Sequence, residues 1–241
     1  MKKTPFKLLV LSSALVSTAV LAEDSPHSFS SNVSFVSDYV FRGITQTGDA
    51  PAIQGGLDYE HASGFYAGVW GSNIEFGGGT DESIEIDYYV GFAGELGSTG
   101  VSYDTSIIYY DYPGQTGDVE FDYVEYYVGL GYEFSGDLAP AVGLGAYYSP
   151  DFFGETDEGI AVELSLDLSL PYEVGFGTYV GVQDVDGTDV PGADDGFSYY
   201  YWSIGFSKAV GPYELGVAYS DTDSDGGDDN DTVVFSISSS F

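Results

Sequence analysis

The sequence predicts an all-β protein: a single antiparallel, up-and-down transmembrane β-barrel of about twelve strands. Three observations support this prediction. Apolar and polar residues alternate along segment after segment, the connections between segments are alternately short and long, and a leader-like segment precedes the first of them. The chain has no cysteine, so neither disulfides nor thiolate metal sites hold the structure together. Its 34 glycines and 22 tyrosines suit a sheet protein with many tight turns and aromatic surfaces.

Residues 1–22 are predicted to be a cleaved signal peptide. Three lysines supply a positive start, residues 8–20 are mostly apolar, and V-L-A before Glu23 is a small-residue cleavage site. The apolar stretch is too short for a transmembrane helix, and no later stretch approaches the length that a helix would need. The chain is therefore expected to leave the cytoplasm, with residues 23–241 forming one barrel domain.

Twelve segments alternate apolar with polar or small residues. The clearest is 160–170, where isoleucine, valine and leucine occupy the even positions and no odd position is strongly apolar. Such a period of two places one face of a strand against apolar surroundings and the other against water. In this register no apolar face carries a charged residue. The strands are expected near residues 32–42, 53–60, 65–72, 84–92, 101–109, 124–134, 142–148, 160–170, 174–182, 200–206, 213–219 and 232–241.

The connections between these segments alternate in length. Short turns lie near Ser63, Gly97, Gly136, Pro171 and Gly211. Longer polar connections span residues 44–51, 75–82, 113–120, 149–159, 184–196 and 221–231. An even-stranded membrane barrel with both termini in the periplasm requires this arrangement. Because hydrocarbon offers no water to unpaired backbone groups, the sheet is expected to close.

The alternative architecture is a secreted β-sandwich, in which the apolar faces form an inner core and the acidic faces lie outside. It predicts a protein that stays in solution without detergent. Aromatic residues near the strand ends favour the membrane barrel, because aromatic belts mark both membrane interfaces. Near the long connections these are Tyr39, Tyr109, Tyr126, Tyr148, Tyr200 and Tyr219; near the short turns they are Tyr59, Phe92, Tyr132, Phe206, Tyr213 and Phe241.

The chain is strongly acidic, with 39 acidic and five basic residues and a formal net charge of −34. Beyond residue 22 the basic residues are Arg42 and Lys208. Such a charge repels nucleic acid and attracts cations, which excludes a nucleic-acid partner. Solubility in a salty habitat and a selective function are alternative explanations of this charge.

The predicted inward faces of the first eight strands hold most of the charge that could carry function. Walls of Asp and Glu inside a channel favour cations; alternatively, these carboxylates only pair with Arg42 or are solvated. Inward aromatic residues could narrow the bore, stack on a sugar-like solute or plug it, namely Tyr66, Trp70, Tyr89, Tyr127, Tyr147, Tyr179, Tyr199 and Tyr201. The candidate pore-lining residues are Asp38, Arg42, Asp58, Glu60, Glu85, Asp87, Asp104, Glu125, Glu163 and Asp167.

The connection 221–231 begins with D-x-D-x-D-G, the opening of a calcium-binding loop. Thr232 replaces the glutamate expected at the twelfth position and strands flank the loop, so it is not an EF-hand. Clustered carboxylates can still bind Ca²⁺ or Mg²⁺ loosely, and Asp221, Asp223 and Asp225 are the candidate ligands. The alternative is a solvated acidic loop that cations bridge to lipopolysaccharide. No other cofactor is expected.

Nothing in the sequence indicates an enzyme. A membrane-barrel hydrolase needs a nucleophile with a base in reach, and the chain contains two histidines. His27 lies next to the expected mature N-terminus and His61 at a short turn, and neither belongs to a recognisable catalytic constellation. The pair Glu85 and Asp87 shares a strand face without any other mark of catalysis.

The first half of the chain contains distinctive segments, S-D-Y-V-F-R-G from residue 37 and P-A-I-Q-G-G from residue 51, followed by D-Y-E-H and G-F-Y-A-G. With E-I-D-Y-Y-V-G-F-A-G-E-L from residue 85, these resemble the TorF-type porins, a proteobacterial family formerly known as the uncharacterised Gcw_chp proteins. The resemblance extends over the whole chain beyond the leader. It implies an outer-membrane barrel for passive transport, although the acidity of the loops departs from the family pattern.

We therefore expect a porin-like channel of the bacterial outer membrane that passes small hydrophilic solutes and prefers cations. The alternative is an occluded barrel with a structural or surface-interaction role through its acidic extracellular loops. Expected partners are outer-membrane lipid, lipopolysaccharide, small solutes or cations, and the barrel-assembly machinery, which would engage Phe241.

Overall fold

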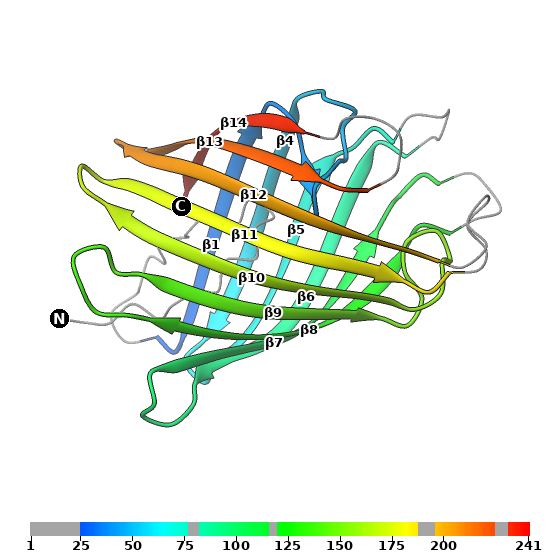
Figure 1. Cartoon of the computed structure of the whole chain (residues 1–241). Helices are drawn as coiled ribbons and strands as arrows, with labels where there is room; N and C mark the ends of the chain where they lie inside the picture. Colours follow the sequence, from blue (N-terminus) through cyan, green and yellow to red (C-terminus); the bar gives the residue numbers. More distant parts are fainter. Residues whose placement is uncertain (1–24, 77–81, 116–119, 188–195, 225–230) are drawn as a thin grey trace.

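The computed structural model describes residues 25–76, 82–115, 120–187, 196–224 and 231–241. These residues form one closed antiparallel barrel (Figure 1). Within these ranges no helix is long and apolar enough to cross a membrane. The predicted signal peptide lies outside the described residues.

The described part of the chain contains twelve barrel strands, as the alternation predicts. They are β1 (His27–Val36), β4 (Ala52–His61), β5 (Phe65–Asn73), β6 (Ile84–Glu95), β7 (Val101–Asp111), β8 (Tyr123–Glu133), β9 (Ala141–Ser149), β10 (Gly159–Leu170), β11 (Val174–Val185), β12 (Phe197–Val210), β13 (Tyr213–Thr222) and β14 (Thr232–Ser240). Consecutive barrel strands pair, and β1 pairs with both β4 and β14, which closes the ring. The predicted up-and-down barrel is confirmed.

The two ends of the barrel differ. The short turns lie at one end, together with the beginning of β1 and the end of β14, on the left of Figure 1. The longer connections lie at the opposite end, on the right. The short turns and the longer connections occur where the sequence places them. The short turns are tight because they contain glycines with positive φ, such as Gly97 and Gly211.

The outer face of the barrel is apolar. On β10, Leu164 is 55% exposed, whereas its inward neighbour Ala161 is buried. The same alternation on β14 exposes Val233, Phe235 and Ile237. A sandwich would turn these faces into a core, so the sandwich alternative is wrong for this chain. The apolar surface must instead meet a partner other than water.

The first barrel strand ends earlier than the sequence predicts. We expected a strand at residues 32–42, but β1 ends at Val36. The chain then turns into the barrel as a small hairpin of β2 (Val40–Phe41) and β3 (Ile44–Thr45). Arg42 and Gly43 join its strands with φ of 46° and 80°, the positive values of a two-residue hairpin turn whose twist matches the strands. The expected surface loop at residues 44–51 thus begins with a strand of this inner hairpin.

The hairpin also corrects the predicted outer face. Tyr39 was expected in an aromatic belt, yet it is only 3% exposed and packs in an interior cluster. Phe41, which alternation would place on the same face of the expected strand 32–42, is partly buried against that cluster. The other belt tyrosines near the long connections have exposed or partly exposed side chains, namely Tyr109, Tyr126, Tyr148, Tyr200 and Tyr219.

Candidate functional site: the barrel interior

Polar side chains of the barrel wall face an interior that is divided into two levels. At the end with the long connections, Glu85, Glu125 and Gln183 are buried. Nearer the short turns, Asp58 and Asp104 keep partial exposure. Because successive residues of a strand alternate between the two faces, these positions all point away from the apolar outer surface.

Arg42 forms the centre of the buried level. Its guanidinium donates from Nη1 to Glu125 Oε1 at 2.7 Å and from Nη2 to Glu125 Oε2 at 2.9 Å. Nη1 also donates to Gln183 Oε1 at 2.8 Å. Arg42 is 5% exposed, Glu125 1% and Gln183 0%. Two parallel bonds from arginine to one carboxylate form a strong and directional ion pair.

Aromatic rings complete the surroundings of this ion pair. The Arg42 guanidinium lies 4.7 Å from the ring centroid of Phe41 and 4.5 Å from that of Tyr147 on β9. The hydroxyl of Tyr110 on β7 donates to Glu125 Oε2 at 2.9 Å. A buried charge is costly unless it is paired and hydrogen-bonded. These contacts give the only arginine of the chain a paired and hydrogen-bonded environment.

Asp38 holds the base of the inner hairpin. Its Oδ1 accepts hydrogen bonds from the hydroxyls of Thr45 at 2.6 Å and Thr47 at 2.8 Å. The Thr47 hydroxyl in turn accepts from the backbone amide of Tyr39 at 3.1 Å. Burial raises the pKa of the Asp38 carboxyl, while the hydrogen bonds from the two threonines act in the opposite direction. Asp38 thus has a positioning role within the hairpin.

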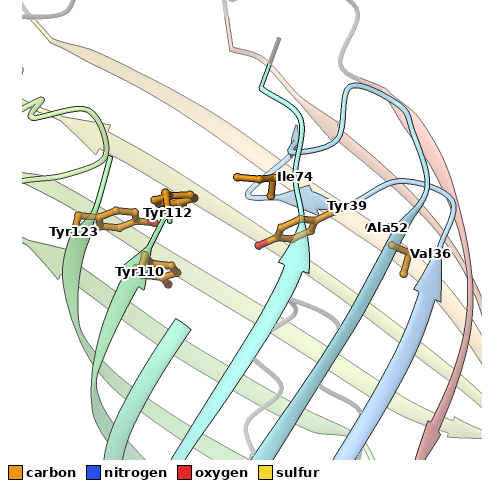
Figure 2. Packing of buried hydrophobic residues seen from close by; sticks show 7 residues of the cluster. All are labelled: Val36, Tyr39, Ala52, Ile74, Tyr110, Tyr112 and Tyr123. Atoms are coloured by element: carbon orange, nitrogen blue, oxygen red, sulfur yellow. The ribbon is translucent and has the colours of Figure 1, made fainter. Parts of the chain in front are cut away.

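An aromatic cluster lies between the hairpin and the barrel wall near the long connections (Figure 2). Tyr110 and Tyr123 stack with ring centroids 4.3 Å apart, and Tyr39 packs edge-on against Trp70 at 5.5 Å. Figure 2 shows Tyr39 beside Ile74, facing the group of Tyr110, Tyr112 and Tyr123. This cluster occupies part of the interior at that end.

Tyrosine–carboxylate pairs recur along the inner wall. Tyr66 donates to Asp104 at 2.6 Å, Tyr89 donates to Asp58, and Tyr201 donates to Glu163 at 2.9 Å. Each pair joins two strands that are separated in the barrel by one intervening strand. The pairs hold both the rings and the carboxylates against the wall.

Glycines on neighbouring strands give these rings their room. A Cβ on Gly181 of β11 would lie 2.3 Å from Cζ of Tyr201, its cross-strand partner on β12. A Cβ on Gly68 would meet the ring of Tyr89, and one on Gly91 the ring of Tyr66, both within 2.5 Å. The inward tyrosines can therefore lie flat over the wall instead of projecting across the bore.

The exchange Gly181→Ala is expected to destabilise the barrel by about 1–3 kcal/mol, because the added methyl group displaces the buried Tyr201 ring. Gly177→Ala on the same strand is the control, since its Cβ would meet only a carboxylate oxygen of Asp167 at 3.0 Å. Urea unfolding of the refolded barrel in lipid vesicles measures the difference. Equal stability of the two variants would contradict this packing role.

The remaining predicted residues have diverse surroundings. Asp87 Oδ1 and Glu85 Oε2 are buried without a hydrogen-bond partner in the structure, although Tyr112 donates to Glu85 Oε1 at 3.4 Å. Glu60 lies on β4 near the short turns and Asp167 lies on β10, both partly exposed. The ten candidates thus occupy the barrel wall and the inner hairpin, with Asp38 and Arg42 on the hairpin segment.

The structure describes only two of the three candidate ligands of the acidic segment 221–231. Asp221 accepts from the amide of Thr222 at 2.8 Å, and Asp223 accepts from the amide of Tyr200 at 2.5 Å. Asp225 lies outside the described residues. Among the residues that are described, no group of three or more His, Asp or Glu side chains is arranged to hold a metal ion. The calcium or magnesium loop stays a prediction.

The structure brings the two histidines together, which the sequence did not suggest. His27 and His61 are cross-strand partners on β1 and β4, with ring centroids 5.1 Å apart. Nδ1 of His27 lies 2.7 Å from the Tyr59 hydroxyl, and Nδ1 of His61 accepts from the Ser63 amide at 3.1 Å. Both histidines are outside the buried interior, at the short-turn end.

The inner hairpin was also missed. Its signal was present: arginine and glycine stand between two short β-branched or aromatic pairs, V-F and I-T. An arginine that is alone in an acidic barrel is a further signal, because a buried guanidinium requires a carboxylate partner.

Comparison with solved structures defines the class of fold as a porin-like barrel. KdgM porin superposes with a TM-score of 0.55 at 9% identity, covering 88% of this chain and 98% of that one. OccD3 (OpdP) of Pseudomonas aeruginosa gives a TM-score of 0.47 at 14% identity and covers 91% of this chain. OpdL of the same organism gives 0.48 at 15% identity, also covering 91%. This chain spans 65% of the length of OccD3 and 69% of that of OpdL.

Sequence comparison identifies the family. Residues 21–241 match the family described as "Bacterial protein of unknown function (Gcw_chp)". The chain therefore belongs to the Gcw_chp family. No curated protein matches it by sequence.

Proposed function

We propose that this protein is a TorF-type porin of the bacterial outer membrane, a channel for passive diffusion of small hydrophilic solutes. One observation carries the proposal: a closed barrel exposes an apolar outer face and encloses a polar one. In hydrocarbon every backbone polar group must be paired within the protein, which a closed barrel achieves. The fold likeness to KdgM porin supports the same class.

A preference for cations follows from the charges of the inner wall. Asp58, Asp104 and Asp167 lie on three different strands and keep partial exposure. Within the described interior, the one arginine is already paired with Glu125. Carboxylates along a pore attract cations and exclude anions, and low-dielectric walls strengthen this field.

An occluded barrel is the second candidate function. The buried hairpin and the aromatic cluster at the end with the long connections favour it. In that case the protein would act through its surface, by the acidic loops, as a structural or interaction protein.

Partners are proposed on the same basis. Outer-membrane lipid would cover the apolar face, and Ca²⁺ or Mg²⁺ would bridge the acidic loops to lipopolysaccharide. Phe241 has an exposed side chain, and its backbone exchanges hydrogen bonds with that of Ser31 at 2.8 and 3.1 Å. This position leaves its ring available to the barrel-assembly machinery.

Planar-bilayer recordings of the refolded protein test the channel. We expect discrete conductance steps and, under a KCl gradient, a reversal potential of the sign for cation selectivity. The double variant Asp58→Asn/Asp104→Asn should reduce that potential, because it removes two partly exposed carboxylates from the inner wall. Asp137→Asn, at an exposed turn position, is the matched control and should leave it unchanged. A membrane-inserted protein without conductance steps would instead support the occluded barrel.

A further inference from the structure

The inner hairpin β2–β3 crosses the barrel from one wall to the other. It begins between β1 and β4, which are neighbours in the ring. Its turn reaches the far side: Arg42 contacts Glu125 on β8, Tyr147 on β9 and Gln183 on β11. In the ring order, β9 and β10 lie directly opposite the junction of β1 and β4. The hairpin, extended by the Arg42 side chain, therefore spans the bore.

The second residue of the turn packs against β12 and β13, which lie between β1 and the far side in the ring order. A Cβ on Gly43 would lie 2.9 Å from the Cβ atoms of both Tyr201 on β12 and Thr222 on β13, and 3.2 Å from the carbonyl oxygen of Asp221. Only a glycine allows this approach at a φ of 80°. Arg42 and Gly43 together thus touch five strands, from β8 to β13 with the exception of β10.

The chemistry of the contact makes it a fixed attachment. The bidentate pair with Glu125 is almost completely buried, and Gln183 and Tyr110 each add one further hydrogen bond to it. Releasing the hairpin would require two charges to separate in surroundings of low dielectric. The pair also neutralises the charge of Glu125.

We propose that the hairpin β2–β3 is the constriction of this channel and that the Arg42–Glu125 pair holds it across the bore. This inference rests on the proposed channel function and identifies which element sets its conductance. Solutes must pass beside the hairpin, so its attachment determines the free cross-section. The carboxylates nearer the short turns then act on charge selectivity below the constriction.

Single-channel recordings of four variants test the proposal. Arg42→Met removes the attachment and exposes the charge of Glu125, so conductance should rise severalfold and cation preference should increase. Gly43→Val forces the turn from the wall without changing any charge, so conductance should rise while ion preference stays constant.

The exchanged pair Arg42→Glu/Glu125→Arg restores the attachment and should conduct as the wild type does. Lys208→Met is the matched control, because Lys208 is the other basic residue beyond the leader and is exposed at the short-turn end.

Folding of each variant is checked by its resistance to protease and its faster migration before boiling on denaturing gels. A silent wild type together with a conducting Arg42→Met variant would also support the proposal, since the hairpin would then close the bore completely. If the wild type conducts and both Arg42→Met and Gly43→Val have the same conductance as the wild type, the hairpin is not the constriction, while the channel function stands. Failure of the exchanged pair to return to wild-type conductance would overturn the role of the ion pair. If no protein of the series conducts, both the inference and the channel function are wrong.

Discussion

Arginine in place of Leu164 should destabilise the barrel in a lipid bilayer by about 2–4 kcal/mol, the cost of a charge on the lipid face near the midplane. Leu164 lies in the middle of β10 and its side chain is exposed on the outer surface. In this position the guanidinium would have to meet hydrocarbon. Urea unfolding in lipid vesicles measures the loss.

The neighbouring variant Ser165→Arg is the control for this prediction. Ser165 is the next residue on the same strand and faces the interior, with Gly143 and Tyr179 as cross-strand partners. An arginine there meets a polar, acidic interior and should cost much less. Similar losses for both variants, or solubility of the wild type without detergent, would show that lipid does not cover the outer face.

Removal of Glu125 should lower the free energy of unfolding by about 3–5 kcal/mol, because it leaves a buried arginine without its counter-charge. This loss is similar to or larger than the one expected for arginine at position 164. In Glu125→Leu the guanidinium of Arg42 keeps only Gln183 among its hydrogen-bond acceptors, and Tyr110 loses its own acceptor. The free energy of unfolding in lipid vesicles is the measurement. Glu133→Leu makes the same replacement at an exposed position of β8 and should change stability by about 0.5 kcal/mol or less.

A double variant separates the ion pair from general packing. Replacing a buried pair by apolar residues of similar volume is often neutral, whereas removing one partner is costly. Arg42→Met/Glu125→Leu should therefore recover most of the stability lost in Glu125→Leu alone. If the double variant is as unstable as the single one, the cost comes from lost packing and not from an unpaired charge.

The predicted strands agree with the structure because the relevant information is local. On β10, six apolar residues at even positions determine the outward face wherever the strand lies. A shift of one residue would turn every one of them inward, so the register has little freedom. The terminal strand, with Val233 and Phe235 outward, follows the same rule.

Residues 37–47 show where local information ends. Tyr39 and Phe41 alternate with polar neighbours as a lipid-facing strand would, and the same pattern suits an aromatic surface packed inside the barrel. Alternation identifies an apolar face without identifying what covers it. The partners of Arg42 are 83 and 141 residues away in the chain, beyond the reach of any spacing rule.

The amino-acid sequence by itself determined that the chain is a closed antiparallel barrel, which residues of the twelve barrel strands face outward and that the inner face is acidic. These properties depend on side-chain period, turn residues and the requirement that backbone groups be paired. Only the tertiary structure decided that a hairpin fills part of the bore, that Arg42 is paired with Glu125, and that tyrosines lie flat over glycines. Those arrangements depend on which strands meet across the ring, and that is set by closure of the whole sheet.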